Sequence, residues 1–412
     1  MKRLGVGLLL SVFVTSALAV QSRPQLLQLT CNALDQAVGA LPEGPVLLAS
    51  YPPLKGKTTD IIALRGVAFT YDNALASIAL YGCGKPQAAG RIADALAYAT
   101  EHDPDYDDGR LRNAYAAGAV KTSGAIVLPG YWSRERNAWN QDAYQVGSAT
   151  GNQAWAALAL LEAYRQTEQP RYLQAARKVL TWTRNHTYDS QTPAGFIGGY
   201  YGYPPNPVRQ GWKSTEHNVD LAAAWSALER IDTNPDSASQ ARLARQFVDS
   251  QWLASEGRFL IGTLPDGQTA EYQRSGLDAQ IWPLIALSNP PADWSRVFGF
   301  VDQAHRFGGG YGFNREPDGL WTEGTAQAAA VAQLTGADDK ARPLWKLLVA
   351  QQAADGWLFA TPQTRISTGL AIGPDSTSND FFYYHLPHLG ATAWAAIAAS
   401  GVNPFTGAQE AN

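Results

Sequence analysis

Two kinds of helical segment alternate along the chain. Segments of the first kind are apolar all round and open on a few polar residues; they cover 71–80, 151–163, 216–228, 278–287, 322–334 and 388–400. Segments of the second kind are amphipathic and cover 24–38, 88–100, 172–183, 238–252, 293–307 and 340–352. A helix that is apolar all round is buried, whereas an amphipathic helix covers a core from outside. The pattern therefore predicts six inner helices and six outer ones.

This strict alternation predicts an all-α fold, an (α/α)6 toroid with six inner and six outer helices. The helix at 24–38 would then be the outer partner of the last inner helix. No strong residue-level repeat is evident, so the toroid is favoured over an open solenoid, which stays as the alternative. No linker divides the chain, and we expect residues 20–412 to form a single catalytic domain.

The connections between helices differ in length according to their direction. Those from an inner to an outer helix are short, at 82–86, 167–170 and 289–292. Those leading back into an inner helix are long, at 103–149, 186–214, 254–274, 308–321 and 354–387. In a toroid these long loops, or small hairpins within them, would gather over one rim, above the N-terminal ends of the inner helices. Long loops in compact domains are usually functional, so we expect the site at this rim.

Residues 1–19 have the composition of a signal peptide. Lys2 and Arg3 precede an apolar run from Leu4 to Val14, and Ala17-Leu18-Ala19 follows as a cleavage pattern. The run is too short for a membrane anchor, and no later run is long enough to span a bilayer. We therefore expect an exported protein, periplasmic or secreted, without membrane insertion.

Composition narrows the class of ligand. Charged residues make up 17% of the chain and aromatic residues 11%, with a net charge of −4 and no basic cluster. These features argue against nucleic acid as a partner. They suit a neutral carbohydrate polymer or oligosaccharide whose sugar faces stack on aromatic rings. We expect the protein to be a monomer.

The two cysteines, Cys31 and Cys83, allow two interpretations. In an oxidising compartment they could form a disulfide, and two buried free thiols fit the sequence equally well. Neither lies in a redox or metal-binding spacing. No His-x-x-x-His pair is present, so we expect no metal and no cofactor.

Acids, amides and histidines are concentrated at the starts of the inner helices. Capping could explain any one of these acids, but the outer helices do not begin in the same way. We therefore expect the polar starts to meet in one pocket. The candidate catalytic residues are Glu216, Asp72, Asp278 and Glu323. The candidate substrate-binding residues are His217, Asp220, Asn73, Tyr144, Trp212, Tyr201, Trp321 and His388.

The helix alternation and four of the helix starts resemble the six-hairpin glycosidase superfamily. These starts are Tyr71-Asp72-Asn73, Ser214-Thr215-Glu216-His217-Asn218, Leu277-Asp278-Ala279-Gln280 and Trp321-Thr322-Glu323-Gly324-Thr325. Members of this superfamily carry (α/α)6 toroids; most are glycoside hydrolases, and some are polysaccharide lyases or sugar epimerases. The resemblance implies an enzyme that acts on carbohydrate, without indicating one hydrolase family.

Helix spacing favours one stereochemical course. Inner helices about 8–10 Å apart would place carboxyls of alternate or opposite helices several ångströms from one another. Inverting glycosidases need roughly 6.5–9.5 Å between their two carboxyls to admit a water molecule. We therefore expect an inverting hydrolase with Glu216 as acid, its pKa raised by apolar surroundings and by Asp220. Asp72 is the expected base, with Asp278 and Glu323 as substitutes or as partners of sugar hydroxyls.

Two other functions fit parts of the pattern. A polysaccharide lyase would use His217, His388 or Tyr144 as base and would need cations such as Arg274, Arg315 and Arg365 near a uronate, but the rim is more acidic than basic. A non-catalytic glycan-binding protein of the envelope would use the aromatic residues alone. A sugar epimerase would favour paired histidines at the rim.

Overall fold

The structure is a computed structural model that describes residues 7–54, 56–232 and 234–408, with side chains described from Ser22 onward. Residues 1–6 of the expected signal peptide lie outside the described residues, and its side chains beyond them are also not described, so that expectation stays a prediction. None of the described helices combines the length and hydropathy that crossing a membrane requires.

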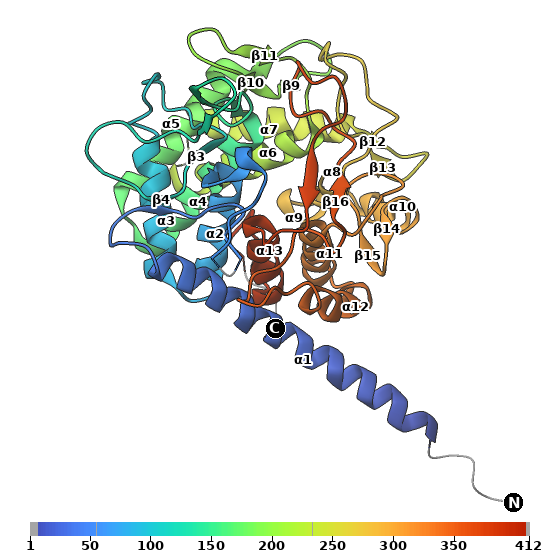
Figure 1. Ribbon diagram of the computed structural model, residues 1–412. Helices are drawn as coiled ribbons and strands as arrows, with labels where there is room; N and C mark the ends of the chain where they lie inside the picture. Colours follow the sequence, from blue (N-terminus) through green and yellow to red (C-terminus); the bar gives the residue numbers. More distant parts are fainter. Residues whose placement is uncertain (1–6, 55, 233, 409–412) are drawn as a thin grey trace, which may run out of the picture.

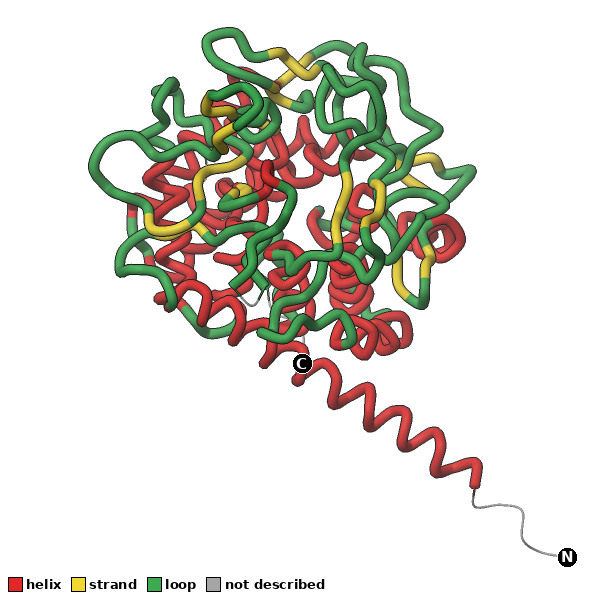
Figure 2. Tube along the Cα trace, in the orientation of Figure 1, coloured by secondary structure: helices red, strands yellow, loops and turns green. Residues whose placement is uncertain are grey.

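Six inner helices form a closed ring in the described part of the chain (Figures 1 and 2). They are α2 (Thr70–Gly82), α4 (Thr150–Thr167), α6 (Thr215–Asp232), α8 (Leu277–Ile281) with its continuation α9 (Pro283–Ala286), α11 (Thr322–Leu334) and α13 (Leu389–Ser400). Each packs against the next in this order, and α13 packs against α2. The predicted (α/α)6 toroid is therefore confirmed, and the open solenoid is excluded.

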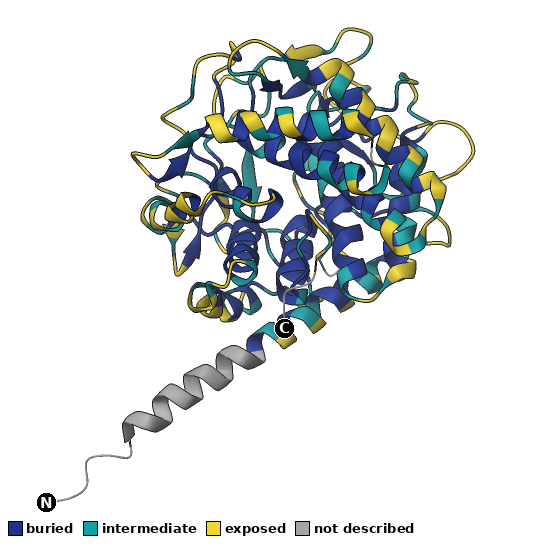
Figure 3. Ribbon diagram, turned by 180° about the vertical axis from the view of Figure 1, so that it is seen from behind, coloured by how far each residue is buried: buried dark blue, intermediate teal, exposed yellow. Residues whose placement is uncertain are grey.

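The outer helices cover this ring. They are α1 (Gly7–Gly39), α3 (Pro86–Ala99), α5 (Pro170–Thr187), α7 (Pro235–Ser250), the 3-10 helix η2 (Ala292–Arg296) with α10 (Val297–Ala304), and α12 (Asp338–Val349). Figure 3 shows that exposed residues follow the outer helices whereas the inner ones are buried. Three outer helices begin with proline, whose fixed φ suits the first helical turn. Cys31 of α1 and Cys83, just after α2, form a disulfide.

One inner helix departs from its predicted form. The segment expected as a continuous helix over 278–287 is divided at Trp282 into α8 and α9, because Pro283 follows and has no N–H to donate. The division places the Trp282 ring against Trp155 of α4 and Trp394 of α13, at centroid distances of 5.3 and 5.5 Å. Phe405, after α13, packs on Trp155 and Trp282. These rings come from alternate inner helices and fill the middle of the toroid.

Short antiparallel strand pairs occupy the long loops; most are hairpins, whereas the first two pairs join the loop before α2 to the loop before α4. The pairs are β1 (Val46–Leu47) with β4 (Gly118–Ala119), β2 (Val67–Phe69) with β3 (Ala114–Ala116), β5 (Tyr131–Ser133) with β6 (Ala138–Asn140), β8 (Tyr188–Asp189) with β9 (Gly195–Phe196), β12 (Trp252–Leu253) with β13 (Arg258–Phe259), β14 (Arg306–Phe307) with β15 (Gly310–Tyr311) and β16 (Arg365–Ser367) with β17 (Phe382–Tyr384). One three-stranded sheet joins β7 (Ser148–Ala149), β10 (Gly199–Tyr201) and β11 (Val208–Gln210).

The rim repeats one hydrogen-bond pattern around the ring. The fourth residue of each inner helix is completely buried and binds through its side chain to the main chain of the loop that precedes the helix. The pairs are Asn73 with Leu48, Gln153 with Leu111, Asn218 with Phe196, Gln280 with Phe259, Thr325 with Tyr311, and Thr392 with Leu358. Buried polar groups need such partners, so these residues fasten each loop to its own helix.

Each loop is also fastened to the preceding inner helix, through the residue two positions after the one that binds its own helix. There a main-chain carbonyl accepts a hydrogen bond from the first N–H of that helix. The pairs are Ser50 with Leu389, Asn113 with Thr70, Gly198 with Thr150, Ile261 with Thr215, Phe313 with Leu277, and Ala360 with Thr322. We call the segments 48–50, 111–113, 196–198, 259–261, 311–313 and 358–360 the clamp segments. These segments and their hydrogen bonds repeat around the ring, although the sequence shows no strong residue-level repeat.

Candidate active site

The second and third residues of the inner helices bring the site together. The second positions hold Tyr71, Gly151, Glu216, Asp278, Glu323 and Gly390, and the third positions hold Asp72, Asn152, His217, Ala279, Gly324 and Ala391. Three of the predicted acids therefore occupy equivalent positions on consecutive helices, and Asp72 follows one residue later on its own. The clamp segments fix the heights of these helix starts, so the four carboxyls meet at one level of the ring.

Glu323 lies at the centre of one group of contacts. Its Oε1 accepts hydrogen bonds from the Tyr71 hydroxyl at 2.7 Å and from Gln327 at 3.3 Å. The same Tyr71 oxygen accepts a bond from the Trp394 indole at 2.8 Å. Burial and the nearby Asp72 carboxyl raise the pKa of Glu323 well above its ordinary value, and the hydrogen bonds only partly oppose this. Glu323 is therefore held protonated by its surroundings.

His388 lies between two of the acids. Its Nε2 is 3.6 Å from Asp72 Oδ2, and its Nδ1 is 3.7 Å from Glu323 Oε2. Burial lowers the pKa of His388 to about 3, so the ring is neutral at ordinary pH. Because Nδ1 accepts the N–H of Ala391 at 3.2 Å, we assign the proton to Nε2, facing Asp72. Burial also raises the pKa of Asp72 to about 7, against a hydrogen bond from Ser50.

Gly390 explains how these groups fit together. A Cβ at this position would lie 2.7 Å from Glu323 Oε2, 2.8 Å from Asp72 Oδ1 and 2.9 Å from the His388 ring. Both carboxyls therefore converge on the space that a side chain would occupy, and the two oxygens are no more than about 5.5 Å apart. The absence of a side chain at the second position of α13 makes room for this pair.

A second group of acids forms around Glu216. Glu216 is half-buried as a residue, its carboxyl lies in buried surroundings, and no hydrogen bond to this carboxyl occurs among the described residues. Burial, then Asp278, then Glu323 raise its pKa well above the ordinary value. Burial raises the pKa of Asp278 to about 6, although the N–H of Ala279 donates to it at 2.6 Å. The other three catalytic candidates are nearly inaccessible, so Glu216 is the one most open to solvent.

Asp220 lies one turn below Glu216 on α6. It is completely buried, and among the described residues neither of its carboxyl oxygens has a hydrogen-bond partner. Burial raises its pKa well above the ordinary value, with Glu216 and then Asp278 as the next causes. A buried ion without a partner is costly, so Asp220 is held in its neutral form next to Glu216.

Tyr144 lies between the two groups. Burial and then the Glu216 carboxyl raise the pKa of its hydroxyl, Asp72 contributes in the same direction, and a hydrogen bond from Asn152 opposes them. Its ring packs near Phe69 and Phe381, at 6.3 and 6.4 Å between centroids. Tyr144 is therefore near enough to both Glu216 and Asp72 to be affected by their charges.

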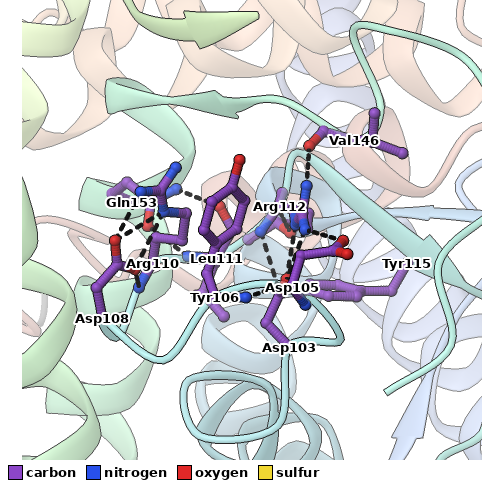
Figure 4. A network of polar contacts seen from close by, with 11 residues as sticks. Asp103, Asp105, Tyr106, Asp108, Arg110, Leu111, Arg112, Tyr115, Val146 and Gln153 are labelled. Carbon is purple, nitrogen blue, oxygen red and sulfur yellow. Dashed lines mark hydrogen bonds and ion pairs between the residues drawn. The ribbon is translucent and has the colours of Figure 1, made fainter. Parts of the chain in front are cut away.

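A buried ionic network holds the Tyr144 segment in place (Figure 4). Arg112, in a clamp segment, pairs with Asp103 at 2.6 Å and with Asp105 at 2.7 Å. It also donates to the carbonyl of Val146 at 2.7 Å, and Asn113 donates to the carbonyl of Tyr144 at the same distance. This network therefore positions Tyr144 without reaching the acids themselves.

Several predicted binding residues have structural contacts instead. Asn73 is buried in a clamp, and Trp321, only 1% exposed, packs against Phe313 and Tyr383. Neither therefore offers a group to a ligand. His217 lies against Gly151 and has a pKa lowered to about 4 by burial, and Trp212 packs beside it. The hydroxyl of Tyr201 is bound by Asp375.

Sequence reasoning missed three residues of the site besides Gly390. Tyr71 holds Glu323, Tyr51 packs against His388 with 4.8 Å between ring centroids, and Tyr383 lies 5.6 Å from the same ring. Burial and the carboxyls raise the pKa values of all three hydroxyls. Only Tyr71 had a signal in the sequence, since it directly precedes Asp72 at a polar helix start.

Cations are scarce near these acids. Among the described residues, the ion pairs of the four catalytic candidates involve His388 alone, whose ring is neutral. No group of three His, Cys, Asp or Glu side chains in the described chain is arranged to hold a metal ion. The site is therefore a set of neighbouring carboxyls whose pKa values are raised by burial and, for Glu216 and Glu323, by one another's charge.

Comparison with known proteins places the fold. No family model and no curated protein sequence matches the chain. Among solved structures, a glycosidase variant in complex with glucose has a TM-score of 0.60 at 12% identity and covers 92% of this chain and 97% of its own. A sugar epimerase from a ruminal bacterium has a TM-score of 0.63 at 11% identity, covering 92% of this chain and 99% of its own. Cellobiose 2-epimerase from Spirochaeta thermophila has a TM-score of 0.60 at 12% identity, covering 92% and 97%.

These likenesses extend over nearly the whole of each chain, and both glycosidases and sugar epimerases are among them. At such low identity they establish the architecture, which agrees with the resemblance seen in the helix starts. The chain therefore shares its (α/α)6 toroid fold with these glycosidases and sugar epimerases.

Proposed function

We propose that this protein is an exported glycoside hydrolase that acts on a neutral polysaccharide or oligosaccharide with inversion of configuration. The observation that carries the proposal is the unequal environment of its acids. Glu216 is more accessible as a residue than the other three acids and has a strongly raised pKa, whereas Asp72 is buried, with a pKa of about 7. A protonated acid beside a group that can ionise near neutral pH is what hydrolysis of a glycosidic bond requires.

Each residue then has a defined role. Glu216 donates its proton to the glycosidic oxygen, so the bond to the sugar can break. Asp72, when ionised, accepts a proton from a water molecule that attacks the anomeric carbon from the opposite face. Asp278 lies next to Glu216, and its pKa of about 6 makes it the substitute for the base. Burial, then the Asp278 carboxyl and then Glu323 raise the pKa of Glu216 and so favour its protonated form.

Neutral sugars suit this site better than uronates. A polysaccharide lyase would have to neutralise a substrate carboxylate, and the described residues bring only the neutral His388 into ion-pair distance of the four acids. Hydrolysis therefore remains the better candidate. A non-catalytic glycan-binding protein would not need an acid such as Glu216, which is half-buried as a residue and has a raised pKa.

A screen with two readouts tests the proposal. Purified protein is incubated with neutral and uronic polysaccharides, and both reducing ends and ultraviolet-absorbing unsaturated products are measured. We expect reducing ends from a neutral polymer, and their loss in Glu216→Gln and Asp72→Asn. The control is Glu135→Gln, an exposed acid in the hairpin loop. Full activity in both acid variants would overturn these roles, and unsaturated products would indicate a lyase.

Epimerisation is the second candidate, because the His388 ring lies between Asp72 and Glu323. A neutral imidazole flanked by carboxyls could move a proton at a carbon next to a carbonyl. Incubation of disaccharides in deuterated water separates the two functions. Epimerisation would give an isomer of unchanged length that carries deuterium on carbon, whereas hydrolysis would shorten the sugar.

A further inference from the structure

One loop crosses above the acids. The strands β16 and β17 form the base of a hairpin that precedes α13, and residues 368–381 extend from it as an arm. Figure 1 shows this red segment rising from β16 toward the green hairpin of β10 and β11. The arm comes from the loop before α13, whereas β10 belongs to the loop before α6. These two helices are three places apart in the ring of six, so the contact spans the rim.

The arm has a defined conformation of its own. At its base, the N–H and the hydroxyl of Thr368 both donate to the carbonyl of Phe381, at 3.1 and 2.9 Å. Phe381 in turn donates to the carbonyl of Leu370 at 3.1 Å, and the N–H of Ile372 donates to Asp380 at 2.8 Å. These hydrogen bonds join the two sides of the arm to each other, so the arm is an ordered element.

The tip of the arm is joined to Tyr201. The hydroxyl of Tyr201 donates to Asp375 Oδ1 at 2.6 Å. The Tyr201 ring also lies directly over Gly373, and a Cβ at residue 373 would overlap it. The close approach therefore requires glycine at this position. A sugar ring cannot stack on the face of Tyr201 that Gly373 covers, which changes the role expected from the sequence.

The arm also passes over the acids. Phe381 at its base lies 6.4 Å from the ring of Tyr144, whose hydroxyl is near enough to the charges of Glu216 and Asp72 for them to raise its pKa. Phe381 also lies 5.8 Å from the Tyr383 ring, which packs near His388. The arm therefore covers the part of the rim around α13, α2 and α4. Among the described residues, no hydrogen bond joins it to the loop before α8, the helix that carries Asp278.

We propose that the arm closes one end of the site, so that the enzyme acts at the end of a glycan chain or on a short oligosaccharide and not on internal linkages. A polymer can be cut internally only where a groove is open at both ends, and the contact of Tyr201 with Asp375 and Gly373 blocks one of them. The terminal sugar lies under the arm near Asp72 and His388. The rest of the chain leaves past Glu216. This inference rests on the hydrolase function proposed above.

The experiment follows the products of cleavage. Cello-, xylo-, manno- and malto-oligosaccharides, labelled at the reducing end, are incubated with the protein, and fragment lengths are read over time. The viscosity of the matching polymers is followed in parallel. We expect release of the terminal unit from one end, with little early fall in viscosity.

Opening the arm should change this pattern. Gly373→Ala separates the tip from Tyr201, and Asp375→Ala removes the hydrogen bond. Both are expected to raise the rate on polymer relative to short oligosaccharide several-fold and to produce internal fragments. Ser378→Ala, an exposed position on the same arm, is the control and should keep the wild-type pattern.

The outcomes separate this inference from the function on which it rests. Labelled fragments of all lengths from the wild type, with an early fall in viscosity, would overturn the chain-end inference while leaving the hydrolase standing. Terminal release that Gly373→Ala and Asp375→Ala leave unchanged would overturn the role of the arm. No cleavage of any glycan by the wild type would remove the hydrolase proposal and this inference together.

Discussion

The Tyr71 hydroxyl donates a 2.7 Å hydrogen bond to Glu323, joining the second residue of α2 to the second residue of α11. The bond crosses α13, which lies between these two helices in the ring. Because the same hydroxyl accepts the Trp394 indole N–H from α13, one oxygen links three neighbouring inner helices. The Glu323 carboxyl, which lies 3.7 Å from His388 Nδ1, is thereby held by a residue that is itself bonded to α13.

Tyr71→Phe should therefore weaken both the fold and the site. The change leaves the Trp394 N–H without a partner and Glu323 Oε1 with only the longer bond from Gln327, and a buried unsatisfied group costs roughly 1–3 kcal/mol. We expect a loss of unfolding free energy in this range, measured by denaturant titration. Tyr272→Phe, at an exposed tyrosine, is the control. Equal stability of the two variants would contradict the proposed link.

Gly390→Ala should abolish activity and leave the helix intact. The new methyl group would displace the carboxyls of Glu323 and Asp72, and a misplacement of about 1 Å can reduce a rate about 100-fold. Activity on the best glycan and the circular dichroism spectrum provide the two readouts. Gly299→Ala is the matched control, because nothing lies within 4 Å of its Cβ. Wild-type activity in Gly390→Ala would show that the acids are not held as described.

Asp72→Asn should change the dependence of stability on pH. The folded protein binds the Asp72 proton with a pKa of about 7, compared with 3.8 for an unperturbed carboxyl. This carboxyl therefore stabilises the fold fully below pH ~4, and the contribution is lost as pH rises through about 7.

The asparagine side chain of this variant does not titrate, so the stability of the variant relative to wild type should increase from pH ~4 to pH ~8, by up to ~4 kcal/mol. Unfolding curves recorded across this range provide the measurement. His217, whose pKa is lowered, titrates in the opposite sense in both proteins and cancels from the difference. A difference that is constant with pH would mean that the environment does not raise the Asp72 pKa.

Asn218→Ala tests the clamps. The side-chain amide of Asn218 forms hydrogen bonds with the N–H and with the carbonyl of Phe196. In the variant these two main-chain groups would remain buried without a partner. A cost of roughly 2–5 kcal/mol follows, visible as a lower denaturant midpoint. Asn379→Ala, at an exposed asparagine, should have no measurable effect. The same midpoint for both variants would show that the clamps contribute little.

Reduction of the disulfide should lower thermal stability. The bond joins residues 52 positions apart, and constraining a loop of that length stabilises a fold by about 4 kcal/mol in the chain-entropy estimate. A reductant should lower the Tm of the wild type but not that of a double variant with Cys31→Ser and Cys83→Ser. Identical responses of the two proteins would contradict a structural role.

The sequence was sufficient for the architecture because burial leaves a local signal. Apolar and amphipathic helices differ in every turn, and the direction of long and short loops placed the acids at one rim. Pro283 indicates that the helix over 278–287 is divided, but the sequence analysis predicted a continuous helix there. Local patterns were therefore sufficient to predict the ring and the positions of Glu216, Asp278, Glu323 and Asp72 within it.

What the sequence could not show were contacts between distant residues. Asn73 and Asn152 look alike at adjacent helix starts, yet the first is taken up by a clamp and the second lies near Tyr144. Trp321 is enclosed by Phe313 and Tyr383, which lie on either side of it in the sequence. Tyr201 and Asp375 are 174 residues apart. Only the closed ring brings such pairs together.

The clamp segments separate the part of each loop that supports the helices from the part that can vary. Each helix start is held by two clamp segments, through the side chain of its fourth residue to the segment of its own loop and through its first N–H to the segment of the next loop. Changes of the chain outside these segments can leave the ring unaltered. The arm at 368–381 begins several residues beyond the clamp at 358–360. Insertions or replacements of loop segments at such places can therefore change which substrates reach the same acids. The toroid would keep its fold, whether the change arises by evolution or by design.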